Sequence, residues 1–458
     1  MEVFIGRERE LALLEDAYSS GGSAVAVYGR RRIGKTFLLE RFCRGRRSLF
    51  LYALRGCMRS NLEHLSVLIA EHTGSEPHRY STYGDLMADL GSICRREGTV
   101  VVIDEFPFLV EGCDTVSSDL RDLVDSVIVH TDSMLILSGS SVRIMEGECV
   151  GPDGGLSGCL DHVIRLGPLT FDECRGFHHG MDERDQLRLY LTVGGVPGYH
   201  RVMRQPTYRE CIMGNFADDC WLADEAGYIL SYEPGSHRGH MDTVQALSDG
   251  TVRQRDVVRR TGMDKGGCSR NISYLVGLGV VERMDPMAGP RGNPVYRVSD
   301  NFLAFNEEVV RRRAHLLSSL NPSGGYGPLE PFIDAFLGRR FEVFCRDYMV
   351  SNYDVLGTGW RADTDDGCTG IDFTIRITSG RNTVDVPIGC WYGEGRAGLA
   401  EYDLSGSHVP GSDGGNPRMV MFSASGFEGD LVEFASETGL VLIGPEELFG
   451  HRAPPAIV

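Results

Sequence analysis

The amino-acid sequence predicts an α/β protein built from more than one domain. Five short apolar runs, SAVAVYG, SLFLYAL, TVVVIDEF, SMLILSGS and HVIRLGPL, alternate with longer helix-compatible segments through about Leu169. This rhythm predicts a parallel sheet flanked by helices. The chain has 458 residues, of which 42% are hydrophobic and 24% charged, as in ordinary globular proteins. That length is enough for about two to four domains, each with its own core.

Composition and charge narrow the classes of protein that the sequence allows. No apolar run approaches the roughly 18 residues that a membrane span needs, and the opening MEVFIGREREL lacks the apolar segment of an export signal. We therefore expect a cytoplasmic protein without a membrane partner. The 13 cysteines never form CxxC, which argues against a disulfide framework and a structural zinc site. The net charge of -18 repels nucleic acid, so any DNA contact needs a local basic patch.

The rest of the chain divides into four further parts. The pattern is mainly helical from Phe171 to Tyr232, interrupted by GGVPGY, and predicts a helical lid. Met241 to Asp300 predicts two short helices, a longer helix and a two-stranded ribbon, and Asn321 to Pro328 predicts a linker. The predicted parts are residues 1–169, the sheet-containing core; 170–238, the lid; 239–302, a third domain; 303–328, a helix and linker; and 329–458, a final α/β domain.

A phosphate-binding loop follows the first predicted strand. The stretch from Gly29 to Thr36 fits G-x-x-x-x-G-K-[ST], and FLLERF after it can begin a helix, which is the strand, loop and helix context that the motif requires. Glycines let backbone N–H groups approach phosphate oxygens, the helix N-terminus adds positive potential, and Thr36 offers a hydroxyl to Mg²⁺. The sequence thus predicts a site for ATP or ADP with Mg²⁺. Its predicted nucleotide contacts are Gly29, Arg30, Arg31, Arg32, Ile33, Gly34, Lys35, Thr36 and Phe37.

The lysine of this loop stands out, because the chain contains only one other, Lys265. Arginine carries the remaining basic charge, including three positions directly before Ile33. A slender ammonium can reach between the β- and γ-phosphates, whereas the broad planar guanidinium does not fit that role interchangeably. We therefore expect Lys35 to take part in catalysis as well as binding.

Two acidic residues follow the apolar strand VVVIDEF. Asp104 there can hold the Mg²⁺ shell, and Glu105 can polarise the attacking water in phosphoryl transfer. The alternative is a solvated acidic loop after a buried strand. The next strand, MLILSGSS, puts Ser138 and Ser140 where a hydroxyl could sense the γ-phosphate, although either serine could equally be an ordinary loop residue.

These motifs together resemble the archaeal ATPase family of the AAA+/STAND group of P-loop NTPases. FIGREREL is similar to the N-terminal box of that family, which implies that Gly6 and Arg7 lie near the adenine or ribose. GGVPGY is similar to its GGxP element, which implies that Pro197 closes over the base. Such proteins often read LYGR, with an arginine that reaches a nucleotide, whereas this chain reads LSGC at residues 156–159. The missing arginine implies slow ATP turnover unless another arginine, such as Arg143 or Arg165, substitutes. It also puts activation by a neighbouring subunit in doubt, and whether the chain forms a homo-oligomer stays open.

The third domain resembles a winged-helix form of the helix-turn-helix module. Cys268, Ile272, Leu275 and Leu278 fall on one helix face, and VERM with PVYRV can make a wing. Residues 251–300 contain nine Lys or Arg and five Asp or Glu, a local balance of +4. The module could bind DNA, or it could pack on the ATPase and relay its nucleotide state. The candidate DNA contacts are Arg253, Lys265, Arg270 and Arg291.

The final domain resembles a restriction-endonuclease-like domain of the PD-(D/E)XK type, through RRFEVFCRDYM, GTGW, GIDFTI and MFSASGF. Glu342 and Asp372 match the first two acidic positions of that site. Gly389 and Trp391 occupy the expected positions of the Glu and Lys that would complete it. The resemblance therefore implies a degenerate site, in which Glu342 and Asp372 are vestigial and serve folding rather than metal binding.

The sequence as a whole favours an ATP-dependent switch that hydrolyses ATP slowly and is coupled to a winged-helix module and a degenerate nuclease-like module. Two alternatives stay open. One is an ATP-regulated DNA nuclease whose metal site uses unexpected residues. The other is a DNA-binding regulator in which ATP is only structural.

Overall fold

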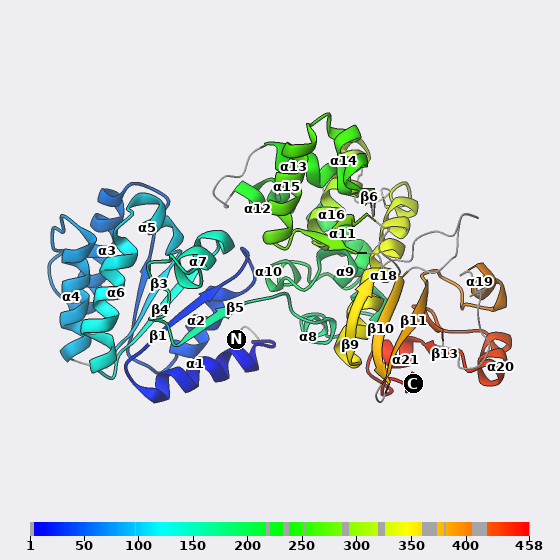
Figure 1. Ribbon diagram of the computed structural model, residues 1–458, viewed down its shortest axis with the longest axis horizontal. Coiled ribbons are helices and arrows are strands. Elements are labelled where there is room, and N and C mark those ends of the chain that lie inside the picture. The colour runs from blue at the N-terminus through cyan, green and yellow to red at the C-terminus, as the bar shows by residue number, and fades with distance from the viewer. Residues whose placement is uncertain are drawn as a thin grey trace. The chain divides into compact units, whose positions relative to one another are not determined.

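The computed structural model describes residues 4–96, 98–216, 220–231, 238–248, 250, 252–285, 293–318, 326–359, 373–379, 382–404 and 419–457 (Figure 1). The chain forms two compact units. The first comprises Met1–Leu169, Val196–Val202 and Gly227–Ser236, and the second comprises Thr170–Gly195, Met203–Ala226 and His237–Val458.

A five-stranded parallel sheet forms the centre of the first unit. Its strands are β1 (Ser23–Tyr28), β2 (Ser48–Tyr52), β3 (Val100–Asp104), β4 (Met134–Gly139) and β5 (His162–Arg165). Their order is β2-β3-β4-β1-β5, and every neighbouring pair is parallel. The five predicted strands and their parallel arrangement are confirmed. β1, β3 and β4 are buried throughout, which explains their unbroken apolar runs, since parallel sheets are covered on both faces.

The helices of the first unit connect these strands. They are α1 (Glu8–Ser20), α2 (Lys35–Cys43), α3 (Met58–Thr73), α4 (Tyr83–Arg96), α5 (Pro107–Gly112), α6 (Val116–Ser126) and α7 (Val142–Cys149). Because all strands run the same way, their carboxyl ends share one edge of the sheet, where ligands of open α/β sheets bind. β4 lies between β1 and β3. The residues that follow these three strands therefore meet at that edge.

The predicted lid is helical, as expected, and its residues are shared between the two units. α8 (Phe171–Arg175), α9 (Glu183–Val193) and α11 (Tyr208–Asn215) belong to the second unit. α10 (Pro197–His200), within GGVPGY, belongs to the first unit. α12 (Trp221–Ser231) begins in the second unit and ends in the first.

The middle of the second unit has three helices and a small antiparallel sheet. The helices are α13 (Arg238–Leu247), α14 (Gln254–Thr261) and α15 (Lys265–Gly277), and the strands are β6 (Val252–Arg253), β7 (Val281–Met284) and β8 (Val295–Val298). The sequence predicts a ribbon of two strands, whereas the sheet has the order β6-β8-β7. β6 has two residues, too few to leave an alternating pattern in the sequence.

A helical stretch leads from this sheet toward the final domain. α16 (Asn301–Phe305) continues through a π-helical turn at Asn306–Val310 and a 3₁₀ turn at Arg311–Arg313 into α17 (Ala314–Ser318). α18 (Glu330–Asn352) then opens the final α/β segment. Within the described ranges, no helix is both long and apolar enough to cross a bilayer.

The final segment has a mixed five-stranded sheet, which confirms its predicted α/β character. Its strands are β9 (Val355–Gly359), β10 (Phe373–Ser379), β11 (Asn382–Trp391), β12 (Val420–Ser423) and β13 (Val441–Ile443), in the order β13-β12-β11-β10-β9. β9, β10 and β11 are antiparallel, and β11, β12 and β13 are parallel. The helices that follow β11 are α19 (Leu399–Leu404), α20 (Gly429–Thr438) and α21 (Pro445–Leu448).

Aromatic side chains join the helices of the predicted lid to the final segment. The ring of Phe171 in α8 lies 5.3 Å from that of Phe344 in α18 and 5.8 Å from that of Phe449, and Tyr190 of α9 lies 6.0 Å from Phe344. Arg175 donates a hydrogen bond of 2.6 Å to the carbonyl oxygen of Phe449. α8 and α9 thus share an apolar core with α18 and the C-terminal residues.

Candidate nucleotide-binding site

The phosphate loop connects β1 to α2 in the first unit. α2 begins at Lys35, and Gly34 before it has a φ of 97° in the left-handed region that favours glycine. Arg32 is also left-handed, with a φ of 65°. A Cβ atom on Gly29 would lie only 2.6 Å from the carbonyl oxygen of Leu166, so the loop needs glycine there for a close backbone approach. The predicted strand, loop and helix are confirmed.

Lys35 is buried beneath this loop. Its Nζ donates hydrogen bonds to the carbonyl oxygens of Gly29 at 2.8 Å and Arg30 at 3.2 Å, and to Oγ of Ser140 at 2.8 Å. These acceptors converge on one compact ammonium from two different loops. They fix the lysine ammonium beside the backbone of the phosphate loop, where phosphate oxygens could replace these three acceptors.

Thr36 and Asp104 form the part of the site that suits a divalent cation. The Thr36 hydroxyl donates a hydrogen bond of 2.8 Å to Oδ2 of Asp104 at the end of β3, and Asp104 is only 3% exposed. Oδ1 of Asp104 accepts the backbone N–H of Glu105 at 3.0 Å. A hydroxyl and a carboxylate are hard oxygen ligands, which fit the preference of Mg²⁺.

Glu105 has a strained backbone and a fixed side chain. Its φ of 54° is rare for a residue with a Cβ atom, and such conformations cluster at functional sites. Its Oε1 accepts the Ser140 hydroxyl at 2.6 Å, and its Oε2 accepts the Ser140 backbone N–H at 3.2 Å. Ser138 is fully buried, and its Oγ has no partner among the described residues. Of the two predicted sensors, Ser140 therefore joins the cluster and Ser138 does not.

The N-terminal segment is tied to the phosphate loop by Arg7. Its Nη2 donates to the carbonyl oxygens of Ile33 at 3.2 Å and Gly167 at 2.6 Å, and its Nη1 pairs with Glu10 at 3.2 Å. Gly6 and Arg7 are both left-handed, with φ values of 66° and 72°. Within the described residues, the non-glycine positions with positive φ are Arg7, Arg32 and Glu105, which all lie in this site.

Residues of α10 pack directly against the phosphate loop. The N–H of Gly198 donates to the carbonyl oxygen of Arg32 at 3.1 Å, and a Cβ atom on Gly198 would lie 2.6 Å from Cβ of Arg32. Pro197 lies beside Gly34. Nη2 of Arg30 donates to the hydroxyl of Tyr199 at 3.3 Å. Gly198 and Tyr199 were not among the predicted contacts, although both belong to GGVPGY.

The remaining predicted contacts lie along the same loop and helix. Arg30, Arg31 and Arg32 are partly exposed, and Ile33 is buried. Phe37 on α2 stacks with Phe4 at a centroid distance of 5.6 Å. Direct contacts of these side chains with a nucleotide stay a prediction.

The segment with the LSGC departure is built into the first unit. Leu156 is fully buried, and Arg121 of α6 donates hydrogen bonds of 2.6 Å to the carbonyl oxygens of Gly155 and Ser157. Arg165, one possible substitute arginine, pairs with Glu146 at 3.0 Å. The other, Arg143, is exposed on α7.

Glu146 also accepts a hydrogen bond of 3.2 Å from the hydroxyl of Tyr28. Burial and the Glu146 charge raise the pKa of Tyr28 to about 12. The Glu146 carboxylate therefore joins Arg165 to the last residue of β1, directly before the phosphate loop.

In the second unit, α15 carries two of the four candidate DNA contacts. Cys268, Ile272 and Leu275 are buried, as its predicted apolar face requires, whereas Lys265 and Arg270 are exposed. Arg253, the last residue of β6, is partly buried, and Arg291 lies outside the described residues.

The nuclease-like positions are only partly within the described ranges. Glu342 lies on α18 and lines a cavity with residues of α13 and β8. Asp372 lies outside the described residues. Gly389 and Trp391 lie on β11, where the resemblance expects the missing Glu and Lys.

Comparisons with known proteins give the fold of the chain. No family model matches it. Uncharacterized protein MJECL04 of Methanocaldococcus jannaschii is 24% identical over 311 residues, 66% of this chain and 68% of its own. The Walker-type ATPase PABY2304 of Pyrococcus abyssi is a similar solved structure, with a TM-score of 0.50 and 16% identity, covering 66% of this chain and 96% of that one. The ORC2 protein of Aeropyrum pernix has a TM-score of 0.48 and 14% identity, covering 69% and 98%.

The likeness to PABY2304 shows the fold alone: 66% of this chain is similar in fold to that Walker-type ATPase. The five-stranded parallel sheet, with the phosphate loop after β1, fits the fold of a P-loop NTPase domain.

Proposed function

We propose that this chain binds ATP with Mg²⁺ and hydrolyses it slowly, and that it acts as a nucleotide-dependent switch. One observation carries the proposal: the ends of β1, β3 and β4 bring together one hydrogen-bonded cluster at the edge of the sheet, made of Lys35, Thr36, Asp104, Glu105 and Ser140. A solvated acidic loop would not hold a buried aspartate against the hydroxyl of the phosphate-loop threonine.

Each member of the cluster has a role in the proposed reaction. Lys35 would neutralise charge on the β- and γ-phosphates, and Thr36 with Asp104 would hold Mg²⁺. Glu105 would orient the attacking water and accept its proton, since its carboxylate is fixed by Ser140. The backbone N–H groups of the phosphate loop would bind the phosphate oxygens.

Slow turnover is proposed because residues 156–159 offer no arginine to the transition state. Leu156 is buried and its segment is held by Arg121, so these residues support the fold of the unit. An arginine that stabilises the developing charge contributes about 10³- to 10⁵-fold to phosphoryl transfer. Arg143 or Arg165, or a second copy of the chain, would have to supply that contribution.

The proposed outputs of the switch are a winged-helix module and a degenerate nuclease-like module. Three helices with the β6-β8-β7 sheet support the first, and the exposed Lys265 and Arg270 of α15 suit phosphate contacts. The order of α18, three antiparallel strands, α19 and the parallel strand β12 supports the second. Gly389 and Trp391 at the catalytic positions support its being inactive.

Phosphate release from ATP, measured for the full chain and for Glu105→Gln, tests the proposed function. The variant should bind ATP with Mg²⁺ as the wild type does but release phosphate at least about 100-fold more slowly, because a general base typically contributes 10²- to 10⁴-fold. Glu111→Gln, an exposed position on α5, is the matched control and should hydrolyse ATP normally. Equal rates in wild type and Glu105→Gln would refute the assigned role.

A further inference from the structure

Two cysteines of the first unit lie on backbone segments that contact each other. Cys57 directly precedes α3, Cys113 directly follows α5, and both are free thiols. A Cβ atom on Gly112 would lie 3.4 Å from the carbonyl oxygen of Gly56 and 3.9 Å from the carbonyl carbon of Cys57. The backbone at Cys57 is therefore in van der Waals contact with the residue before Cys113.

Cys57 has the surroundings of a reactive thiol. Its side chain is exposed, and it stands at the N-terminus of a helix of 16 residues, which adds positive potential there. Its Sγ lies 3.4 Å from the hydroxyl oxygen of Ser60. The hydrogen bond with that hydroxyl, followed by the backbone N–H of Ser60, lowers the pKa of the Cys57 thiol. The thiolate is the form that attacks an oxidant, so Cys57 suits the first step of an oxidation.

Cys113 has the surroundings of a second thiol that can be reached from there. It is partly exposed, and its Sγ lies 3.3 Å from the hydroxyl oxygen of Thr115. The contacts of both sulfur atoms with neighbouring hydroxyl groups lie at the surface, where water can replace them. Neither sulfur is therefore held in its present rotamer by a buried partner among the described residues.

The side chain of Tyr83, at the start of α4, lies close to both sulfur atoms. It is 1% exposed, and its hydroxyl has no hydrogen-bond partner among the described residues. Burial, followed by the charges of Cys113 and Cys57, raises the pKa of Tyr83 to about 12. A sulfur atom is a weak acceptor, so a cysteine rotamer that turns inward gains a hydrogen bond from this hydroxyl. The unpartnered hydroxyl thus favours rotamers that bring the two sulfurs to one place.

We propose that Cys57 and Cys113 form a reversible disulfide when the protein meets hydrogen peroxide. The Cys57 thiolate attacks one peroxide oxygen, an S–O bond forms as the O–O bond breaks, and the released hydroxide takes up a proton and leaves as water. Cys113 then loses its proton and attacks the sulfur of this sulfenic acid. The S–S bond forms, the S–O bond breaks, and a second water leaves. The two thiols are oxidised and the peroxide is reduced to water.

The disulfide ties the start of α3 to the end of α5. α5 begins at Pro107, directly after Glu105 and Phe106, and the N–H of Phe108 donates to the carbonyl oxygen of Glu105 at 2.9 Å. The modified segment therefore follows the nucleotide site in the chain. The inference does not rest on the proposed hydrolysis of ATP, because neither cysteine belongs to the hydrogen-bonded cluster of that site.

Peptide mapping of the full chain tests the proposal. The reduced protein is treated with hydrogen peroxide, the remaining thiols are blocked with N-ethylmaleimide, and a tryptic digest is analysed by mass spectrometry without reduction. The expected product joins the peptide of residues 56–59 to that of residues 97–121, in a protein that migrates as a monomer on a non-reducing gel. Treatment with dithiothreitol should remove this product.

Two variants separate the roles of the two thiols. In Cys113→Ser the sulfenic acid has no thiol to resolve it, so dimedone should accumulate on Cys57, whereas the wild type loses this label as the disulfide forms. Cys57→Ser removes the attacking thiolate and should abolish both the disulfide and the dimedone label. Cys220→Ser changes a partly exposed thiol of the second unit and should form the disulfide as the wild type does.

The mapping of the wild type keeps the test decisive if a variant does not fold, because it needs no substitution. The proposal is overturned if peroxide does not join the two peptides, or if Cys57 forms disulfides equally well with other cysteines. It is also overturned if the joined peptides occur only in covalent dimers.

Discussion

Both carboxylate oxygens of Glu105 accept hydrogen bonds from Ser140, one from its hydroxyl at 2.6 Å and one from its backbone N–H at 3.2 Å. The same hydroxyl accepts a hydrogen bond of 2.8 Å from Nζ of Lys35. Ser140 therefore connects the end of β3 with the phosphate loop after β1. It can do so because β4, which it follows, lies between those two strands.

Replacing Ser140 with alanine should slow ATP hydrolysis by about 5-fold and change ATP affinity little, because one hydrogen bond that orients Glu105 is worth roughly 1 kcal/mol. Phosphate release at saturating ATP measures the first effect, and fluorescence titration measures the second. Ser138→Ala is the matched control, since the Ser138 hydroxyl has no partner among the described residues. Faster hydrolysis in Ser140→Ala would mean that Ser140 restrains Glu105 instead of orienting it.

Lys35→Ala should remove most of the stabilisation that ATP with Mg²⁺ gives the first unit. Ligand at 100 times its dissociation constant adds about 2.7 kcal/mol to the stability of the form that binds it. A thermal-shift series with increasing ATP measures this gain. The natural control is Lys265→Ala, because it changes the other lysine of the chain, which lies exposed on α15. An identical ATP response in wild type and Lys35→Ala would contradict the assignment of the phosphate loop.

The lowered pKa of Glu282 predicts how the stability of the second unit depends on pH in acid. Burial raises the pKa of Glu282, but the ion pairs with Arg297 and Arg346 outweigh it and lower the pKa below its ordinary value of 4.5. A carboxyl group with a lowered folded-state pKa stabilises the fold above its unfolded pKa, and that stability is lost as pH falls through the folded pKa. The unit should therefore lose stability progressively below about pH 4.5.

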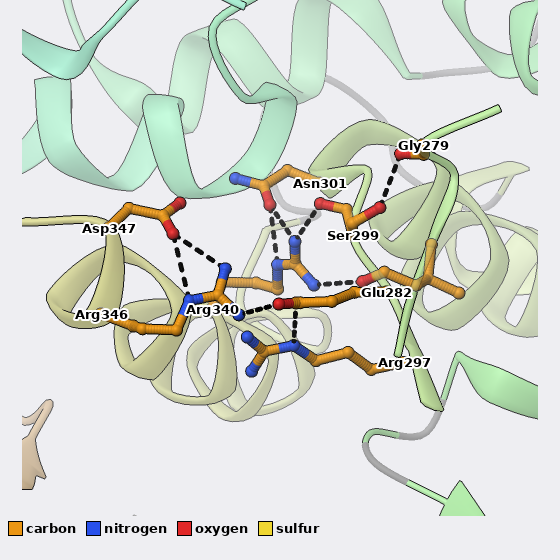
Figure 2. A network of polar contacts seen from close by, with 9 residues as sticks. Gly279, Glu282, Arg297, Ser299, Asn301, Arg340, Arg346 and Asp347 are labelled. Atoms are coloured by element: carbon orange, nitrogen blue, oxygen red, sulfur yellow. Dashed lines mark hydrogen bonds and ion pairs between the residues drawn. The ribbon is translucent and has the colours of Figure 1, made fainter. Parts of the chain in front are cut away.

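Glu282→Gln should lower the free energy of unfolding at pH 7 by about 3 kcal/mol, because two largely buried arginines lose their shared partner (Figure 2). Its stability should also depend less on pH below 4.5 than that of the wild type. Urea unfolding at pH 7 and at several acid values measures both effects. Glu433→Gln, at an exposed position of α20, should behave as the wild type. An unchanged acid response in Glu282→Gln would show that other carboxyl groups cause it.

Local sequence signals were sufficient for the strands and the phosphate loop. The strands of the first sheet are short runs of β-branched and other apolar residues that are buried on both faces, so their composition alone identifies them. The loop is equally local, because its glycines, Lys35 and Thr36 are consecutive or nearly so. Asp104 could be placed at the edge of the sheet because it ends one of those strands.

Long-range contacts could not be predicted in the same way. The contact between Gly198 and Arg32 joins residues far apart in the sequence, and so does the position of Ser140 between Lys35 and Glu105. The cavity depends on side chains from α13, β8 and α18 that share no local pattern. Such sites arise where distant segments pack together, and no local periodicity of the sequence indicates which segments do so.

Duplex DNA, if it binds, should bind weakly and through phosphate contacts on the exposed face of α15. The chain carries a net charge of -18, and the described basic residues of that face are Lys265 and Arg270. Arg270→Ala should weaken binding similarly across sequences and reduce the slope of log affinity against log salt by about 1. Fluorescence anisotropy at several salt concentrations measures this.

Arg59→Ala is the control for DNA binding, because Arg59 is exposed on α3 and pairs with Glu63 in the first unit. It should bind DNA as the wild type does. Tight binding that is insensitive to salt and to Arg270→Ala would show that the DNA contact lies elsewhere.

The final α/β segment should not cleave DNA. Metal-dependent cleavage needs carboxylates that hold a metal and a basic group beside the charge that develops on the phosphate. Gly389 and Trp391 stand at two of these positions, and the sequence has no lysine after Lys265. Arg376 could replace the lysine only by leaving Asp385, with which it forms hydrogen bonds of 2.6 and 2.9 Å across β10 and β11.

Plasmid and linear DNA should therefore stay intact with Mg²⁺ or Mn²⁺, with or without ATP, as judged on agarose gels. The decisive comparison is Asp372→Ala. Cleavage by the wild type that disappears in this variant would support the alternative of an ATP-regulated nuclease. Cleavage that persists in the variant would come from a different site or from a contaminating enzyme, because cleavage by restriction-endonuclease-like domains requires that aspartate as a metal ligand.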